Sequence, residues 1–207
     1  MKHNVIIVGA GALGSHVALL ARNWDAKLTV IDFDRVEQKN VLAQFHTKMG
    51  MRQNKAQALA KAMQGLFGLK LHPVPHRLTE DNVAALLGRS EDDAGVMGLE
   101  GIGTTLVIDC TDNIEARMLI QGYCKPNGTP CLHGCLSADG QFMRAVWTED
   151  FNPDPEGFEG EATCEGGEQL PFYAMAAGLI AQIAQRWLTD WIKESHQLMP
   201  GALVRLA

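Results

Sequence analysis

Three motifs in the first two thirds of the chain, at residues 5–14, 28–34 and 106–113, contain the residue types of a nucleotide-binding site. The first is the sequence GAGALG at residues 9–14, directly after the apolar run at residues 5–8. Gly9 permits a tight turn, Gly11 lets the backbone approach a phosphate, and Gly14 allows the next helix to pack against the strand. The N–H groups at the start of that helix would face the anion. The motif therefore predicts a phosphate-binding loop.

The second motif begins with an acidic residue after the next apolar run. Asp32 follows residues 28–31, about 20 residues beyond the glycine motif, where dinucleotide-binding folds place the acid that binds the ribose hydroxyls. This feature alone would favour an NAD-dependent oxidoreductase. Asp34, Asn40 and Gln44 follow at a spacing that a dinucleotide fold does not require. They argue against that interpretation.

The complete pattern resembles the ubiquitin-activating-enzyme-like family, which includes the ThiF and HesA proteins and the molybdopterin-synthase adenylyltransferases. Four motifs occur in the family's order. They are the glycine motif, DxDxVxxxNxxxQ at residues 32–44, GMRQNK at residues 50–55 and DCTDNIEAR at residues 109–117. The resemblance implies ATP and Mg²⁺ as ligands, and adenylation of the C-terminal glycine carboxylate of a small ubiquitin-like protein.

The resemblance also assigns roles to individual residues. Lys55 would bring a cation to the phosphates, Asp112 would hold Mg²⁺, and Asp32 would bind the ribose. Such roles suit a reaction in which catalysis depends on alignment and charge neutralisation. The residues implied to bind the nucleotide are Gly9, Gly11, Ala12, Gly14, Asp32, Asp34, Asn40, Gln44, Lys55, Asp112 and Asn113.

One position departs from the family pattern. The family has an arginine, implied to contact the phosphates, where this chain has Ala43. Arg35, Lys39, Arg52 or a partner subunit could replace it, and the sequence does not choose among them.

The cysteines differ in their expected roles. Relatives of this family carry a reactive cysteine on a mobile crossover loop, and Cys164 occupies the corresponding acidic, Gly- and Pro-rich segment at residues 148–169. A thioester between Cys164 and the activated partner is therefore implied. Cys110, at the end of a strand, is expected to lie in the core. The chain has no CxxC pair, so we expect no structural zinc.

The elements that would position these residues alternate between short strands and helices, which predicts a parallel sheet. We expect an α/β fold with a Rossmann-like, mostly parallel sheet, an antiparallel C-terminal extension and helices on both faces, in a single domain over residues 1–207. The strands expected are 5–8, 28–32, 69–75, 105–109, 130–134, 141–147 and 203–206. The helices expected are 12–24, 52–66, 80–88, 113–125 and 171–195.

The long C-terminal helix is apolar on nearly every side in its first half, residues 172–181. A single sheet cannot cover so many faces. We therefore expect a homodimer through this helix, with a buried central helix as the alternative. His133, beside a glycine, is interpreted as a core or turn residue rather than a metal ligand or acid–base catalyst.

Composition limits the classes of function. The 207 residues are 46% hydrophobic and carry a net charge of −6, which argues against a nucleic-acid surface. No uninterrupted apolar stretch is long enough to span a membrane, and no signal peptide is expected. These features predict a cytoplasmic enzyme.

Three functions remain open on the sequence. The first is an activating enzyme for a ubiquitin-like protein, with a Cys164 thioester that a conjugating enzyme could receive. The second is an adenylyltransferase for a sulfur-carrier protein in thiamine or molybdopterin biosynthesis. The third is an NAD-binding oxidoreductase or an inactive nucleotide-binding scaffold. The absence of CxxC pairs and the short chain favour the first.

Overall fold

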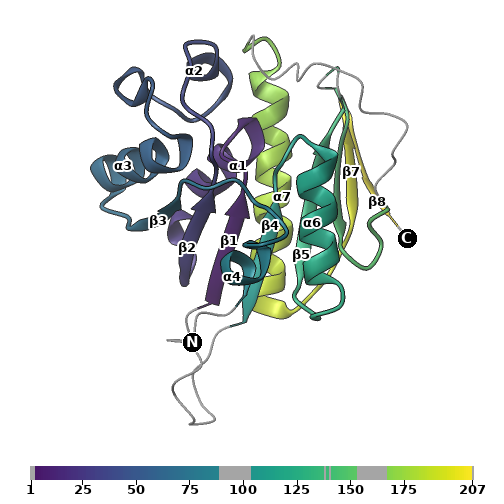
Figure 1. Cartoon of the computed structure of the whole chain (residues 1–207). Coiled ribbons are helices and arrows are strands. Elements are labelled where there is room, and N and C mark those ends of the chain that lie inside the picture. The colour runs from purple at the N-terminus through teal and green to yellow at the C-terminus, as the bar shows by residue number, and fades with distance from the viewer. Residues whose placement is uncertain (1–2, 89–103, 138, 140, 153–166, 207) are drawn as a thin grey trace.

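The computed structural model describes residues 3–88, 104–137, 139, 141–152 and 167–206. Within them, one eight-stranded sheet has the order β3-β2-β1-β4-β5-β6-β7-β8 (Figure 1). The first five strands in that order are parallel, and the last three are antiparallel to their neighbours. This arrangement confirms the expected fold class. The strands are β1 His3–Val8, β2 Ala26–Ile31, β3 Leu71–Val74, β4 Thr105–Asp109, β5 Cys131–Leu136, β6 Met143–Trp147, β7 His196–Met199 and β8 Ala202–Arg205.

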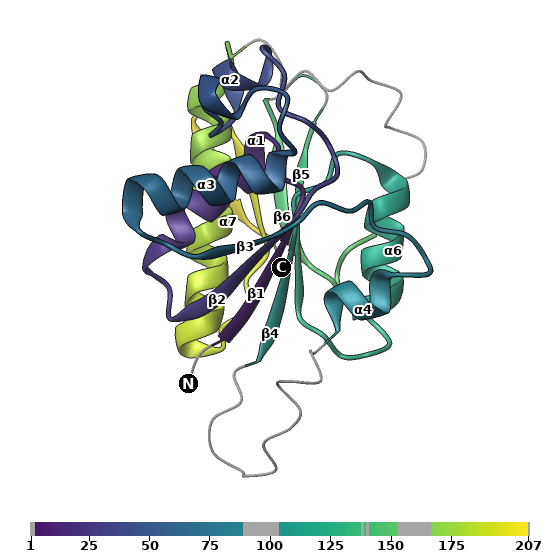
Figure 2. The same cartoon turned by 60° about the vertical axis from the view of Figure 1, so that its left-hand side comes forward.

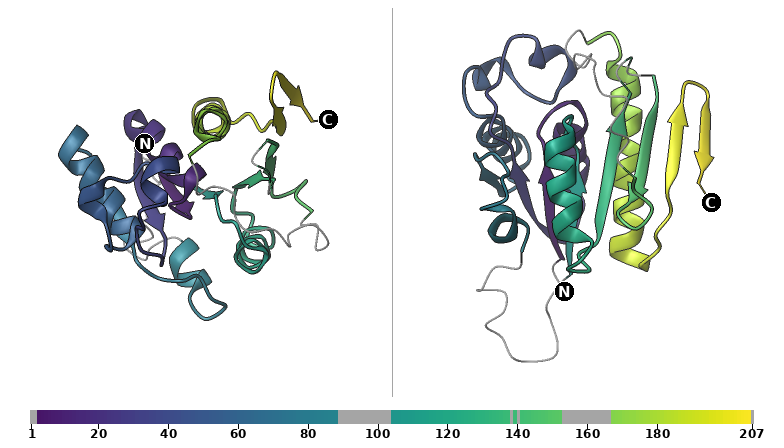
Figure 3. Two further views of the ribbon diagram at one scale, coloured as in Figure 1. Left: turned by 90° about the horizontal axis from the view of Figure 1, so that it is seen from above. Right: turned by 45° about the vertical axis from the view of Figure 1, so that its right-hand side comes forward.

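Helices cover both faces of the sheet, as Figure 2 and the view from above in Figure 3 show. Val5 and Ile7 of β1 pack into a core with α1, α3 and α7, whereas Ile6 and Val8 pack into a second core with α4 and α6. Successive side chains of a strand point to opposite faces, so a strand buried on both sides is apolar throughout. The α-helices are α1 Ala12–Leu20, α2 Asn40–Ala43, α3 Lys55–Phe67, α4 Val83–Leu87, α6 Ile114–Cys124 and α7 Leu170–Asp190.

Local capping explains where two of these helices begin. The side chain of Asn54 accepts a hydrogen bond from the backbone N–H of Gln57 at the start of α3, and Asn113 does the same for Ala116 in α6. Asparagine is among the best N-cap residues because its side chain satisfies an otherwise unpaired N–H group. Both capping residues belong to the motifs identified in the sequence.

The C-terminal end of the fold differs from the sequence expectation. Helix α7 ends at Asp190 rather than at residue 195, and Trp191 adopts a left-handed conformation with φ = 59°. The chain then forms the hairpin β7–β8 beside β6, of which only a last strand was predicted. None of the helices in the described residues is long and apolar enough to cross a membrane.

The apolar first half of α7 is covered within the chain. Phe172, Tyr173, Ala176 and Ile180 are buried and belong to the same core as α1 and the sheet. Met175 is half exposed. The buried central helix, given above as the alternative, therefore explains this sequence without a partner. The homodimer stays a prediction.

Candidate functional site

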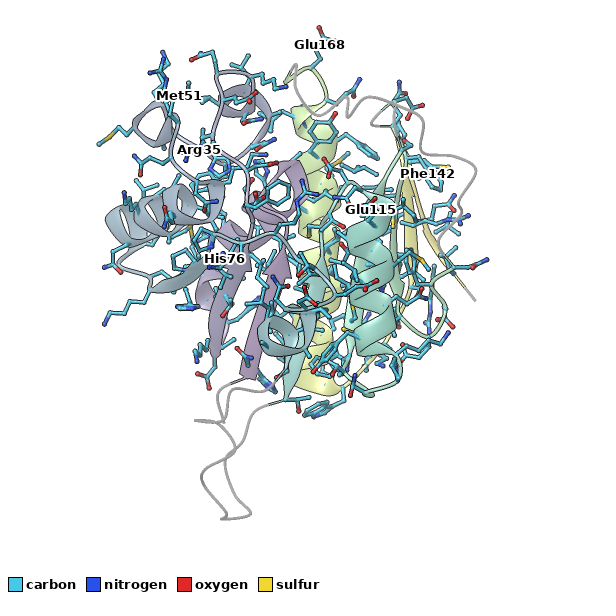
Figure 4. All side chains as sticks on the ribbon, viewed as in Figure 1. Arg35, Met51, His76, Glu115, Phe142 and Glu168 are labelled. Atoms are coloured by element: carbon cyan, nitrogen blue, oxygen red, sulfur yellow. The ribbon has the colours of Figure 1, made fainter. Side chains whose placement is uncertain are left out.

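A pocket of about 870 Å³ lies at the carboxyl ends of the parallel strands. It lies where the strand order reverses between β1 and β4, the point at which open α/β sheets bind ligands. Arg35, His76, Glu115 and Phe142 are four of its lining residues, and Figure 4 shows how widely they spread across the molecule. The predicted site residues that line it are Gly9, Gly11, Ala12, Asp32, Asp34, Asn40, Gln44, Lys55, Asp112 and Asn113.

The glycine loop has the geometry that its spacing predicts. A Cβ on Gly14 would lie 1.8 Å from the carbonyl oxygen of Gly9, so a larger residue does not fit at this position without a backbone shift. Gly9 itself has φ = +92°, a conformation that favours glycine. A Cβ on Gly11 would meet no atom within 4 Å, and Gly11 lines the pocket. Gly14 therefore serves packing, whereas Gly11 leaves space for a ligand.

Asp32 joins the end of β2 to the glycine loop. Its Oδ2 atom accepts a hydrogen bond of 2.6 Å from the backbone N–H of Ala10, and its Oδ1 atom accepts one of 2.8 Å from Asp34. Burial raises the pKa of the Asp32 carboxyl, and the hydrogen bond from Ala10 opposes that change. The carboxylate is thus fixed at the pocket wall, where its remaining lone pairs can accept bonds from ribose hydroxyls.

Lys55 is held at the first turn of α3. Its backbone N–H donates to the carbonyl of Asp34 over 2.8 Å, and its Nζ atom lies 3.1 Å from the Asp34 carboxylate. The side chain is 11% exposed, so the ammonium is largely withdrawn from solvent. A phosphate in the pocket would compete with Asp34 for this cation.

Asn40 and Gln44 have different environments. The Oδ1 atom of Asn40 accepts from the backbone N–H of Glu37 over 2.8 Å, which holds the loop before α2. The buried Oε1 atom of Gln44 has no hydrogen-bond partner in the described residues. A buried oxygen without a donor is costly unless a ligand or water supplies one. Of Asn40 and Gln44, only Gln44 therefore has a side-chain oxygen that could accept a hydrogen bond from a ligand in the pocket without losing a bond within the described residues.

The cations considered as replacements for the family arginine differ in whether they line the pocket. Ala43 is fully buried in the core and does not line the pocket, whereas Arg35 and Lys39 do. Arg52 lines a separate hollow instead. Two of the three cations considered as replacements for the family arginine are therefore present at the pocket, and Arg52 is not.

Asp112 is exposed at the pocket, directly before the cap of α6. The described residues contain no group of three His, Cys, Asp or Glu side chains arranged to hold a metal ion. Mg²⁺ commonly binds through one or two carboxylates together with substrate phosphates. The donor set at Asp112 fits a magnesium ion that arrives with a nucleotide.

A buried polar network beneath the pocket was missed by the sequence reasoning. Asp109 accepts hydrogen bonds from the N–H and hydroxyl of Thr111 and, over 2.8 Å, from Nδ1 of His133. The Nε2 atom of His133 lies 2.7 Å from the Thr148 hydroxyl. Arg117 contacts the carbonyl of Thr111 and lies 4.0 Å from the Asp109 carboxylate.

This network holds the loop that carries Asp112. Burial by itself raises the pKa of Asp109, but Arg117 and His133 bring it below its usual range. The carboxylate is therefore a charged anchor for Thr111, next to Asp112. His133 is fully buried, as the core interpretation requires, and its ring stacks on Phe151 at 3.9 Å. The presence of Arg117 in the motif at residues 109–117 was the one signal that could have revealed the network.

The pocket extends from the glycine loop to strands β5 and β6. Cys135, Phe142 and Arg144, from β5, β6 and the loop between them, line its far end. Burial raises the pKa of the Cys135 thiol, although Arg117 opposes this change. Cys110 is buried, as expected, and Cys164 lies outside the described residues.

Fold and pocket together define an α/β protein of the Rossmann type, with its pocket at the carboxyl ends of the parallel strands. The model of the ThiF family matches residues 1–203, so the chain belongs to the ThiF family.

Curated relatives support the same family. The chain is 29% identical to the SAMP-activating enzyme E1 of Haloferax volcanii over 74% of this chain and 56% of that protein. It is 28% identical to ubiquitin-like modifier-activating enzyme 5 of Drosophila virilis, over 96% of this chain and 53% of that protein. It is also 28% identical to the molybdopterin-synthase adenylyltransferase of Salmonella typhimurium, over 70% of this chain and 55% of that protein.

Solved structures share the fold. E. coli MccB with ATP superimposes with a TM-score of 0.70 at 13% identity, over 99% of this chain and 63% of that one. PaaA gives a TM-score of 0.71 at 14% identity, with the same coverage. The chain spans about half the length of the curated relatives it matches.

Proposed function

We propose that this chain uses ATP to adenylate the C-terminal glycine carboxylate of a ubiquitin-like protein. The observation that carries the proposal is the convergence of Lys55, Asp32, Asp112 and the open face of Gly11 on one pocket. The names of three relatives support it, because each is an activating enzyme or an adenylyltransferase. An oxidoreductase or an inactive scaffold gains no such support.

In the proposed reaction, a carboxylate oxygen of the partner attacks the α-phosphorus of ATP. The new bond gives an acyl-adenylate, the bond to the β-phosphate oxygen breaks, and pyrophosphate leaves. Lys55 compensates phosphate charge, the glycine loop contacts the phosphates, and Asp32 fixes the ribose. A magnesium ion held by Asp112 would supply further positive charge when bound. Lys39, which lines the pocket, is proposed to replace the family arginine, because the guanidinium of Arg35 is held by the carbonyl of Arg52.

The far end of the pocket is proposed to receive the partner's C-terminal tail. Phe142 and Arg144 line this end, with the guanidinium 5.4 Å from the ring centroid. A tail that enters from β6 would meet the α-phosphate near the centre of the pocket. This path keeps the carboxylate and the nucleotide in one cavity, as an in-line attack requires.

A second proposed step moves the partner to Cys164. The thiolate attacks the acyl carbonyl carbon, a thioester forms, and AMP leaves. Cys164→Ala should keep pyrophosphate exchange and lose any adduct sensitive to reductant. Mass spectrometry with ATP, Mg²⁺ and the partner should place the adduct on a peptide that contains Cys164. An adduct on Cys135 instead would contradict the assignment, as would one that survives Cys164→Ala.

Two classes of partner remain. The alternative to a ubiquitin-like modifier is a sulfur-carrier protein, and one relative is named as a molybdopterin-synthase adenylyltransferase. A pull-down in the presence of ATP, followed by mass spectrometry, distinguishes them by identifying the captured protein. Transfer to a conjugating enzyme, a cytoplasmic location, a homodimer, the single domain over residues 1–207 and the mobile loop at 148–169 all remain predictions.

The adenylation proposal is tested by Lys55→Ala and Asp112→Ala. Each should reduce kcat/KM for ATP–pyrophosphate exchange by about 30-fold or more, equivalent to about 2 kcal/mol, because phosphate charge is left uncompensated. Assays would contain candidate ubiquitin-fold proteins that end in Gly-Gly. Lys70→Ala, an exposed lysine before β3, is the matched control and should keep wild-type exchange. Wild-type exchange in both site variants would refute the proposal.

A further inference from the structure

A second hollow, of about 480 Å³, lies outside the nucleotide pocket, beside the start of α3. Three of the side chains that line it are cationic and none is acidic, in a chain with a net charge of −6. We call it the basic hollow. Its lining residues are Phe33, Arg35, Arg52, Gln53, Asn54, Gln57, Lys61 and Pro75.

Neutral groups hold two of the three cations of the basic hollow in place. Arg35 donates to the carbonyl of Arg52 over 2.9 Å, and the Nζ atom of Lys61 donates to Oε1 of Gln53 over 2.6 Å. Gln53 is itself fixed, because its Nε2 atom donates to the carbonyl of Met49. Across the described part of the chain, no ion pair joins any of the three cations to a carboxylate. The charges of Arg35 and Lys61 are therefore held in position, and no carboxylate pairs with any of the three cations among the described residues.

The backbone at Arg52 is adapted to this arrangement. Arg52 has φ = 66°, a left-handed conformation that glycine adopts at lower cost. Its N–H donates to the carbonyl of Val36, and Arg35 forms an isolated bridge with Asn54, so the two segments are paired across the hollow. Arg52 therefore adopts a conformation that glycine would adopt at lower cost, and its side chain adds a guanidinium to the lining of the basic hollow.

The basic hollow is distinct from the place proposed for the phosphates of ATP. The glycine loop and Asp112 follow β1 and β4, whereas the hollow lies beside residues that follow β2 and β3. Phe33 and Arg35 border both cavities, so the hollow adjoins the ribose side of the nucleotide pocket. An anion in the hollow is thus a different group from the triphosphate.

We propose that the basic hollow binds an oxyanion next to the nucleotide pocket. The shared chemistry is that of a phosphate or carboxylate group, supplied by a small phosphorylated molecule or by acidic side chains of a docked protein. Guanidinium and ammonium groups without carboxylate partners favour such ligands. The proposal does not depend on adenylation, because it concerns binding outside the reacting atoms.

The test is a titration followed by ¹H–¹⁵N NMR, with inorganic pyrophosphate and, separately, a tetraglutamate peptide. We expect at least one probe to shift the amide signals of Arg52, Gln57 and Lys61 in a saturable manner. Arg52→Gly and Lys61→Gln should each weaken that binding by roughly threefold to tenfold. Arg52→Gly suits the left-handed backbone, so its thermal midpoint should not fall. Lys70→Gln is the matched control and should bind as the wild type does.

The two probes distinguish the source of the oxyanion. A response to pyrophosphate indicates a phosphorylated small molecule, and a response to tetraglutamate alone indicates a protein segment. The proposal is overturned if neither probe shifts these signals, even when pyrophosphate shifts those of the glycine loop. It is equally overturned if Arg52→Gly and Lys61→Gln bind the active probe as tightly as Lys70→Gln. The ATP affinity of the same variants, measured by calorimetry, shows separately whether the nucleotide pocket is intact, so a loss of probe binding at the basic hollow can be told from a loss of ATP binding.

Discussion

At the scale of single residues, the pocket depends on side chains whose charge is set by burial. Asp32 and His46 both contact Ala10 in the glycine loop, Asp32 through the N–H and His46 through the carbonyl. The Nε2 atom of His46 lies 2.8 Å from that carbonyl oxygen and must carry the proton to donate. One peptide segment is thus held from both sides. Its position relies on a histidine that is 6% exposed.

His46 makes stability depend on pH. Burial lowers its pKa from 6.5 to about 4, so between these pH values the unfolded chain binds more protons than the folded one. Stability should therefore fall as pH decreases through this range, by about 3 kcal/mol at most from this residue. Urea unfolding between pH 7 and pH 4 measures the effect.

The matched variant for this measurement is His46→Gln. Glutamine keeps an N–H donor for the carbonyl of Ala10 but does not titrate. The loss of unfolding free energy between pH 7 and pH 4 should be smaller in the variant, by up to about 3 kcal/mol. Parallel curves for the two proteins would show that His46 does not carry this pH dependence.

At the scale of elements, two glycines of one loop can be separated experimentally. Gly14→Ala should destabilise the fold by about 3 kcal/mol, because its Cβ would overlap the carbonyl of Gly9. Gly11→Ala should leave the thermal midpoint unchanged, since its Cβ meets no atom within 4 Å. The same Cβ would occupy space that a phosphate needs, so the ATP affinity measured by calorimetry should fall at least tenfold, equivalent to about 1.4 kcal/mol.

This pair of variants also tests the assignment of the loop. Gly11→Ala with wild-type ATP affinity would mean that the nucleotide does not approach this part of the backbone. Gly14→Ala with wild-type stability would mean that the contact between α1 and the strand can relax.

The elements that the sequence predicted well are those with local causes. The strand before Gly9, the acid after β2 and the start of α6, one residue after the predicted residue 113, all depend on residues close together in the chain. The end of α7 depends on a distant contact instead. Trp191 turns out of the helix and packs edge-on against His3 at 5.9 Å, which no pattern near residue 190 indicates.

The same distinction applies to the candidate site. The nucleotide-binding motifs predicted their residues individually, and the pocket gathers them because strand ends meet at one edge of the sheet. The link from Asp109 to His133 and Thr148, and the basic hollow, join segments far apart in the sequence. Their polar partners become neighbours only through folding, so spacing along the chain could not predict them.

At the scale of the whole molecule, the long helix α7 decides how the dimer prediction should be tested. Neighbouring positions in its first half have opposite environments, because Ala176 is fully buried and Met175 is 52% exposed. Ala176→Glu should strongly destabilise the chain, since it buries a charge without a partner. Met175→Glu should change stability by only about 0.5 kcal/mol, as most surface substitutions do.

Met175→Glu should also leave the molecular mass in solution unchanged, as measured by sedimentation equilibrium at equal protein concentrations. The reason is that the apolar half of α7 is already covered by α1 and the sheet, so Met175 alone offers too little apolar surface for a stable helix-on-helix contact. If the wild type is dimeric and Met175→Glu halves its mass, α7 lies in the interface, as the sequence analysis predicts. If both proteins have the same mass, any dimer uses another surface of the molecule.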